Sequence, residues 1–169
     1  MGDNNQVLSF DLMGIKECQR NRYPLLFVDK ITEVVPEKRA KGIKCFTYNE
    51  WFFPAHFDDE PSVPGFILME CLVQTFIMTF LSIEEYKGMK TSFSSLDKMI
   101  FKRQIVPGER LDIEATLTSF KRGIAKGYAK SYVAGEFACS AEFVITIPEV
   151  LKQFKPKINP INNNNDSGR

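Results

Sequence analysis

The residues best suited to chemistry are the only histidine, His56, and a carboxylate that follows it by fourteen positions, Glu70. Glu70 stands in a segment that is otherwise almost entirely apolar, where an ionisable group is costly to bury unless it is paired or neutral. A buried glutamic acid with a raised pKa holds a proton at neutral pH and acts as a general acid, while a neutral imidazole acts as a general base. The two residues therefore predict proton transfer.

The Pro64-Gly65 step between them predicts the start of a helix. Backbone N–H groups in the first turn have no partner within a helix, so the N–H of Gly65 could stabilise negative charge on a carbonyl oxygen. A base, an acid and an oxyanion donor within fifteen residues suit removal of a proton next to a carbonyl group. Other interpretations stay open on the residues alone. Glu70 could cap a loop or bridge a subunit interface, His56 could be a satisfied loop residue, and Cys71 could be a nucleophile paired with His56.

The element that must position this chemistry is the apolar segment 66–83, which predicts one long helix. Its length reaches the lower bound for a membrane span. Glu70, Gln74 and three hydroxyl side chains interrupt it, however, and the chain has no second apolar segment. A helix that is apolar on every face is one wrapped by other structure. We therefore expect a buried central helix and no membrane span.

Apolar residues that alternate with polar ones predict strands on both sides of this helix. The candidate strands are 25–35, 40–48, 91–101, 110–121, 125–133 and 136–147, with a short helix near 11–19. Arg122-Gly123 and Ala134-Gly135 are typical of tight hairpin turns, so the last four strands predict an antiparallel meander. The fold class expected is α+β, with one antiparallel sheet wrapped around a long central apolar helix. A single domain is expected over residues 1–150, with the first 20 or so peripheral, and a Lys/Pro/Asn-rich flexible tail over 151–169.

The bulk composition narrows the function classes. The net charge is only +1, but residues 87–130 carry 10 basic and 4 acidic side chains, which indicates an anionic partner or a solvated lysine-rich face. Nothing resembles a nucleic-acid-binding pattern. The four cysteines are widely spaced and only one histidine could join them, which argues against a metal site and a disulfide scaffold. The first residues lack the features of a signal peptide, so a cytoplasmic protein is expected.

Several motifs resemble one known family in the same order along the chain. They are Asn21–Asp29, Asn49–Phe57, Val63-Pro64-Gly65, Glu70–Gln74, Leu96-Asp97-Lys98, Phe101-Lys102-Arg103 and Val106–Glu109. On these residues the chain resembles the 3-hydroxyacyl-(acyl carrier protein) dehydratases of the FabZ type, which have the hot-dog fold. The His–Glu spacing and the Pro-Gly between them are the specific part of the resemblance.

The resemblance implies a role for each matched residue. His56 would take the α-proton, Glu70 would protonate the departing β-hydroxyl, Gly65 would polarise the thioester carbonyl and Gln74 would orient Glu70. His56 of one subunit would face Glu70 of the other in a homodimer, which in this family often assembles into a trimer of dimers. The substrate would arrive on the phosphopantetheine of an acyl carrier protein, docked at Lys98, Lys102 and Arg103, and no cofactor is expected.

The chain departs from the family at three places. Asn21 stands where the family usually has His, and Asp58-Asp59 stand where it has Pro-Gly. The tyrosine that the family has near the mouth of its acyl tunnel is replaced by Ser92 or its neighbours. These departures make a specialised lipid or polyketide pathway an alternative to housekeeping fatty acid synthesis. A hot-dog acyl thioesterase and a non-catalytic acyl- or carrier-binding subunit are the rival functions. Acyl chain length, isomerase activity, and carrier protein against coenzyme A are left open by the sequence.

Overall fold

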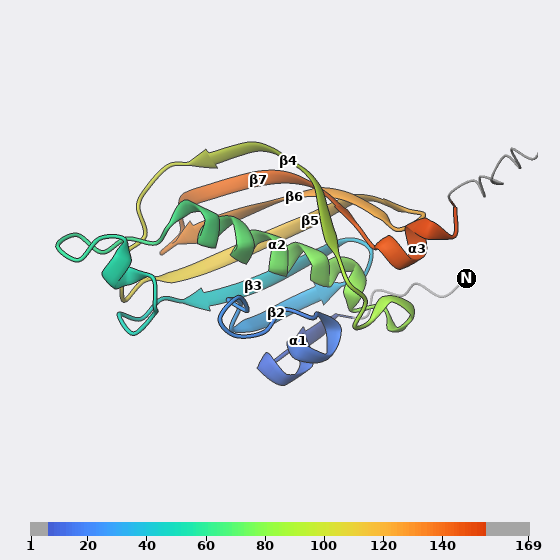
Figure 1. Ribbon diagram of the computed structural model, residues 1–169, viewed down its shortest axis with the longest axis horizontal. Coiled ribbons are helices and arrows are strands. Elements are labelled where there is room, and N and C mark those ends of the chain that lie inside the picture. Colours follow the sequence, from blue (N-terminus) through green and yellow to red (C-terminus); the bar gives the residue numbers. More distant parts are fainter. Residues whose placement is uncertain (1–6, 155–169) are drawn as a thin grey trace, which may run out of the picture.

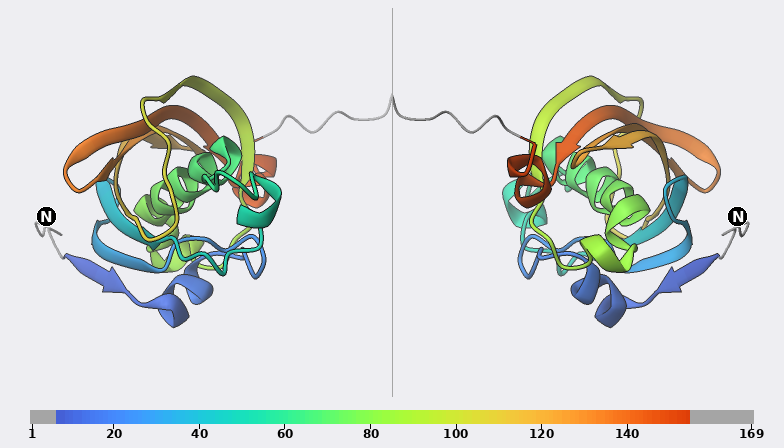
Figure 2. Two further views of the ribbon diagram at one scale, coloured as in Figure 1. Left: turned by 90° about the vertical axis from the view of Figure 1, so that its left-hand side faces the viewer. Right: turned by 90° about the vertical axis from the view of Figure 1, so that its right-hand side faces the viewer.

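A long helix, α2 (Gly65–Leu81), runs through the middle of the molecule, and a curved sheet surrounds it (Figures 1 and 2). The computed structural model describes residues 7–154. Thirteen of the seventeen residues of α2 are buried, which is the packing expected for a helix that is apolar on every face. The predicted α+β fold, with an antiparallel sheet around a central helix, is confirmed. Between residues 7 and 154 no helix is long and apolar enough to cross a bilayer.

Over the described residues 7–154 the sheet has seven strands, and every neighbouring pair is antiparallel. Its order is β1-β2-β3-β5-β6-β7-β4, which Figure 1 shows from β2 up to β4. The strands are β1 (Leu8–Phe10), β2 (Lys30–Val35), β3 (Arg39–Cys45), β4 (Ser92–Phe101), β5 (Arg110–Lys121), β6 (Ile124–Val133) and β7 (Glu136–Thr146).

The predicted four-strand meander is correct for β5, β6 and β7 but wrong for β4. Both edges of β5 are already paired, with β3 on one side and β6 on the other. Strand β4 therefore pairs with β7 and forms an outer edge of the sheet. The segment 102–109 carries the chain from that edge back to the middle of the sheet, so one side of β4 has no strand partner among residues 7–154.

Two-residue turns join the strands of the meander, as predicted. Arg122 and Gly123 connect β5 to β6, and Ala134 and Gly135 connect β6 to β7. All four residues have positive φ, from 50° to 84°. Two consecutive residues with positive φ are the geometry of the hairpin turn whose twist matches that of the flanking strands, and glycine at the second position takes it without steric strain.

The predicted strand from residue 25 begins later, at Lys30. The N–H groups of Phe27 and Val28 do not join the sheet, because both donate to the side-chain oxygen of Gln74, at 2.9 and 3.2 Å. A polar side chain on the central helix thus takes the place of a strand partner for two residues. The segment before β2 is held against α2 for this reason.

Short elements close the two ends of the described chain. Helix α1 (Leu12–Cys18) begins after Asp11, whose carboxylate accepts the N–H of Gly14 at 2.9 Å and so satisfies one of the free amides of the first turn. Helix α3 (Pro148–Lys152) extends across the expected domain boundary at residue 150. The rest of the expected tail, residues 155–169, lies outside the described residues.

Two glycines of the sheet let α2 approach closely. A Cβ atom on Gly42 of β3 would collide with the side chain of Thr75, and a Cβ atom on Gly127 of β6 would collide with the ring of Phe76 and the carbonyl oxygen of Thr116. Thr75 and Phe76 are neighbours in the middle of α2. The absence of side chains at these two sheet positions therefore sets the depth at which the helix lies in the sheet.

Candidate active site

Glu70 lies in the second turn of α2 and is mostly enclosed. Its Oε1 atom accepts two hydrogen bonds, from Nδ2 of Asn21 at 3.0 Å and from Nε2 of Gln74 at 2.9 Å. Burial raises the pKa of the Glu70 carboxyl above its ordinary value, while the hydrogen bonds from Gln74 and Asn21 act in the opposite direction. The net effect favours the protonated carboxyl, which is the form that a general acid needs.

Gln74 is completely buried one turn after Glu70 and makes four hydrogen bonds. Its oxygen accepts the N–H groups of Phe27 and Val28, and its amide nitrogen donates to Glu70 and to the carbonyl oxygen of Leu25 at 2.6 Å. Exchanging the two ends of the amide would place donors against donors and acceptors against acceptors. The orientation of Gln74 is therefore unambiguous, and its N–H points at Glu70.

Asn21 also contacts Glu70, which the sequence did not indicate. It lies 49 positions before Glu70 in the chain, in the segment between α1 and β2. The motif that contains it contributed to the family resemblance, but as a site of departure rather than as part of the acid–base pair. The structure makes it a direct partner of the acid.

His56 follows the 3₁₀ turn η1 (Phe53–Ala55) in the aromatic loop before α2. Its Nδ1 atom lies 3.0 Å from the carbonyl oxygen of Ser62, and the N–H of Ser62 donates to the carbonyl oxygen of His56 at 2.9 Å. A carbonyl oxygen only accepts, so Nδ1 carries the proton in a neutral imidazole. Nε2 is then left with a lone pair, which is the arrangement of a general base. Asp58 and Asp59, the departures next to it, are exposed.

Gly65 begins α2 directly after the N-cap residue Pro64. Its N–H is one of the first-turn amides that have no acceptor within a helix. The ring of Phe101, at the end of β4, covers Gly65 so closely that a Cβ atom there would lie 2.9 Å from Cζ of the ring. Glycine is therefore the residue type that lets Phe101 rest on the helix start.

The predicted site residues fall into two groups within one chain. Glu70 and Gln74 are in contact, whereas no described hydrogen bond or cavity joins His56 to Glu70. Gly65 and Glu70 are five residues apart, which is about 7.5 Å along a helix axis. Among the described residues, His56 and Glu70 of one chain are therefore not in hydrogen-bond contact.

A cavity of about 190 Å³ lies beside Glu70. It is lined by Asn21, Glu70, Val73, Ile77, Thr91, Ser92, Phe93 and Ile145. Apart from Glu70 itself, these side chains carry no charge. Four of the eight lining residues, Val73, Ile77, Phe93 and Ile145, are apolar, so the cavity beside Glu70 has both polar and apolar walls.

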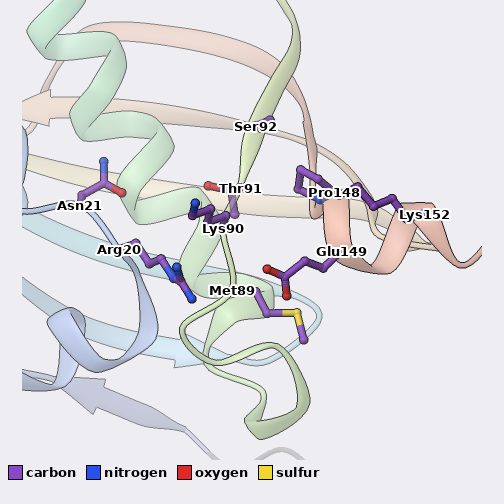
Figure 3. A pocket seen from close by; sticks show the side chains of 9 residues that line it. All are labelled: Arg20, Asn21, Met89, Lys90, Thr91, Ser92, Pro148, Glu149 and Lys152. Atoms are coloured by element: carbon purple, nitrogen blue, oxygen red, sulfur yellow. The ribbon is translucent and has the colours of Figure 1, made fainter.

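A larger and more open pocket of about 450 Å³ adjoins this cavity, and Figure 3 shows the side chains around it. The two share Asn21, Thr91 and Ser92. Three cations, one anion and two further residues complete its lining: Arg20, Lys90, Lys152, Glu149, Met89 and Pro148. Lys90 lies in the basic part of the sequence, but nothing in the pattern indicated that Arg20 and Lys152 would join it.

The residues predicted to dock a carrier protein lie on and after β4. Lys98 pairs with Glu142 of β7 at 2.9 Å, and Arg103 pairs with Glu109 at 2.5 Å. Lys102 is exposed. Two of the three predicted cations therefore already have a carboxylate partner within the chain.

The alternative nucleophile, Cys71, is unsuitable. Its side chain is fully buried, and burial raises the pKa of its thiol well above the ordinary value. A thiol in that state is unreactive, because the thiolate is the nucleophile.

Comparison with known proteins shows the family of the chain. A model of the FabA-like domain matches residues 20–142. The chain is 42% identical over 135 residues to the 3-hydroxyacyl-[acyl-carrier-protein] dehydratase FabZ of Clostridioides difficile strain 630, which covers 80% of this chain and 95% of that protein. It is 44% identical over 137 residues to the FabZ of Bacillus pumilus strain SAFR-032, covering 81% and 95%.

Two solved structures share the fold at low sequence identity. The dehydratase heterocomplex ApeI:P from Xenorhabdus doucetiae superposes with a TM-score of 0.70 at 12% identity, over 82% of this chain and 95% of that chain. A hypothetical thioesterase protein with coenzyme A from Streptococcus pneumoniae TIGR4 superposes with a TM-score of 0.52 at 11% identity, over 69% and 83%.

Proposed function

The chain belongs to the FabA-like family, and we propose how its residues dehydrate a 3-hydroxyacyl thioester. Its FabZ relatives are more than 40% identical to it over about four fifths of the chain. It is a 3-hydroxyacyl-[acyl-carrier-protein] dehydratase of the FabZ type, which acts in fatty acid biosynthesis. The reaction converts a 3-hydroxyacyl thioester to the trans-2-enoyl thioester and water.

In the proposed mechanism His56 removes a proton from the carbon next to the thioester carbonyl, through Nε2. The electron pair of that C–H bond forms the new C=C bond, and the C–O bond to the β-hydroxyl breaks. Glu70 supplies the proton that turns the departing hydroxyl into water. The N–H of Gly65 holds the thioester oxygen, where negative charge develops as the proton leaves.

The single observation that supports this assignment best is the environment of Glu70. Its carboxyl is mostly enclosed on an apolar helix, and its only hydrogen-bond partners among the described residues are two neutral amides, those of Asn21 and Gln74. Neutral amides orient a carboxyl group without the strong stabilisation of the charged form that a lysine or arginine would bring. Such a carboxyl retains its proton to higher pH than an exposed one and is suited to donate it.

The active unit in this proposal is a homodimer. We infer that His56 of one subunit and Glu70 of the other complete the site, because no hydrogen bond among the described residues joins the two side chains within one chain. Strand β4 offers the surface for a dimer, because it is an edge strand and one of its sides has no strand partner in the part of the chain that the structure describes. Four large apolar side chains on this strand are 40–50% exposed: Phe93, Leu96, Ile100 and Phe101. An exposed edge of this kind favours pairing with another strand, and further assembly into a trimer of dimers remains a prediction.

The substrate in this proposal is carried by acyl carrier protein on its phosphopantetheine arm. Docking at Lys98, Lys102 and Arg103 is the first candidate. The pocket with Arg20, Lys90 and Lys152 is the second, because it adjoins the Glu70 cavity. Charge reversal of each set, assayed with a carrier-linked substrate and with a short thioester mimic, separates the two. Only the set that docks the carrier should affect the carrier-linked substrate more than the mimic.

The experiment that tests the function is mass spectrometry of the purified protein with a 3-hydroxyacyl thioester and, separately, with the trans-2-enoyl thioester. Loss or gain of one water with the thioester intact supports the proposal, and Glu70→Gln protein is the matched control, expected to be inert. Release of a free acid would instead identify a thioesterase. No change with carrier-linked or coenzyme A substrates would favour a binding subunit.

A further inference from the structure

Both hydrogen bonds to Glu70 reach the same oxygen atom. Asn21 Nδ2 and Gln74 Nε2 lie 3.0 and 2.9 Å from Oε1. A carboxylate oxygen offers about two lone-pair positions, so these two donors occupy Oε1 fully. Among the described residues no hydrogen bond reaches Oε2. A proton placed on Oε1 would displace one of the donors, whereas a proton on Oε2 displaces none.

The two donors differ in what holds them. Gln74 is fixed by three further hydrogen bonds to the backbone of residues 25–28. Asn21 comes from a different part of the chain and lines both the Glu70 cavity and the open pocket next to it (Figure 3). It therefore contacts the Glu70 carboxyl from a segment outside α2, and it belongs to the lining of both hollows.

We propose that Asn21 is a positioning residue for the acid: with Gln74 it occupies Oε1 of Glu70 and leaves Oε2 as the oxygen that holds the proton and delivers it to the departing hydroxyl. This inference rests on the proposed function for the delivery step. The geometry of the carboxyl does not depend on it. Asn21 would act through Glu70 and not on the substrate, so its loss should lower kcat and leave KM largely unchanged.

The charged groups around Glu70 affect how the pH dependence of kcat, which tests the role of Asn21, is interpreted. On α2 the neighbouring titratable residue is Cys71, which burial keeps as a thiol. The cavity walls contribute Ser92 and Phe93 of β4, Ile145 of β7 and Thr91 just before β4, which carry no charge. Across the adjoining pocket stand Arg20, Lys90, Lys152 and Glu149. None of these residues changes in the variants below, so a shift of the profile in Asn21→Leu, which adds no titratable group, can be assigned to the lost hydrogen bond.

The first test compares kcat against pH for wild type, Asn21→Leu and Asn21→His. Leucine has a similar size but no donor, and a hydrogen bond to a carboxyl of this kind corresponds to a rate factor of about tenfold. We expect kcat of Asn21→Leu to fall by about that factor. The hydrogen bond from Asn21 opposes the rise in the pKa of Glu70, so the alkaline limb of the profile should move to higher pH when it is lost. Asn21→His restores an N–H donor and should recover most of the rate.

A second test needs no turnover. The C=O stretch of the protonated Glu70 carboxyl can be isolated by infrared difference spectroscopy against Glu70→Gln. It should move to higher wavenumber in Asn21→Leu, because the carbonyl oxygen Oε1 loses a donor. Asn21→Ala serves as a second donor-free variant if Asn21→Leu folds poorly, and Thr118→Val, which loses an exposed hydrogen bond to the backbone of Lys126, should leave both readouts unchanged.

An unchanged alkaline limb and an unchanged C=O stretch in the donor-free variants would overturn the role of Asn21 while leaving the dehydratase assignment intact. Wild-type protein that is inert towards 3-hydroxyacyl thioesters would overturn the proposed function, and the infrared shift would still decide whether Asn21 holds Oε1. The two failures are therefore distinguishable.

Discussion

Subunits that carry His56→Ala and subunits that carry Glu70→Gln should restore activity to each other when they are mixed. If each site takes its base from one chain and its acid from the other, a mixed dimer contains one intact site and one site that lacks both groups. Random pairing of equal amounts gives about half mixed dimers, so about a quarter of wild-type activity should return.

The structure indicates that this signal is measurable. Loss of a positioned acid or base lowers the rate by about 10²–10⁴-fold, so each variant alone should be nearly silent. Glu70→Gln preserves the local geometry, because the amide oxygen of glutamine can accept the same two hydrogen bonds that reach Oε1 from Asn21 and Gln74. Recovery in the mixture would then come from the reassembled site and not from repair of a misfolded chain.

The assay is hydration of a trans-2-enoyl thioester, followed by loss of its ultraviolet absorbance, with the two variants co-expressed under different affinity tags. Tandem purification isolates the mixed dimers, which should have about half of wild-type activity because one of their two sites is intact. Wild-type subunits paired with the double variant His56→Ala/Glu70→Gln provide the control, because a shared site leaves that mixed dimer without any complete pair. An inactive first mixture together with a half-active control would show that each chain holds its own site and would refute the reasoning.

Three further predictions concern stability and assembly. The pKa of Glu70 is raised in the folded state, so wild type loses stability as pH rises from about 4.5 through that raised pKa. The Tm of Glu70→Gln relative to wild type should therefore increase over this pH range and level off above it. A Tm difference that does not vary with pH would contradict this. Lys44→Met removes a nearly buried ammonium from its two carboxylate partners, Asp29 and Glu50. It should lower the free energy of unfolding, measured by urea titration, by about 2 kcal/mol. The control Lys41→Met breaks an exposed pair with Glu114 and should change the free energy of unfolding little. Leu96→Lys on the β4 edge should give inactive monomers in sedimentation experiments, and Met13→Lys, an equally drastic change at an exposed residue of α1, should leave the assembly as in wild type.

The parts of the fold that the sequence predicted are those specified by local patterns. The apolar run that became α2 and the turns at Arg122-Gly123 and Ala134-Gly135 depend on neighbours within a few residues. The placement of β4 beside β7 could not be predicted in this way, because strand pairing depends on which edges are already filled. The short strand β1 was missed, since three residues carry too little of an alternating pattern.

The difference between local patterns and long-range contacts also explains which site residues could be predicted. Glu70 was conspicuous because a carboxylate on an apolar helix contradicts its surroundings, and Gln74 lies one turn away from it on the same face. Asn21 carried no such signal, since an asparagine in a polar segment is unremarkable until the fold places it beside the acid. The late start of the strand predicted from residue 25 has the same origin, because it depends on a side-chain oxygen 46 and 47 positions further along the chain.

The two glycines under the central helix have a consequence for how substrate preference can evolve. Thr75 and Phe76 sit in the spaces that Gly42 and Gly127 leave in the sheet, so α2 cannot slide or roll without forcing a side chain into the backbone of the strands. Glu70, five residues before Thr75 on the same helix, is thereby held at a fixed depth relative to the sheet. A preference for longer or shorter acyl chains would then arise from larger or smaller side chains in the cavity wall, and not from movement of Glu70. The wall residues concerned are Val73, Ile77, Phe93 and Ile145.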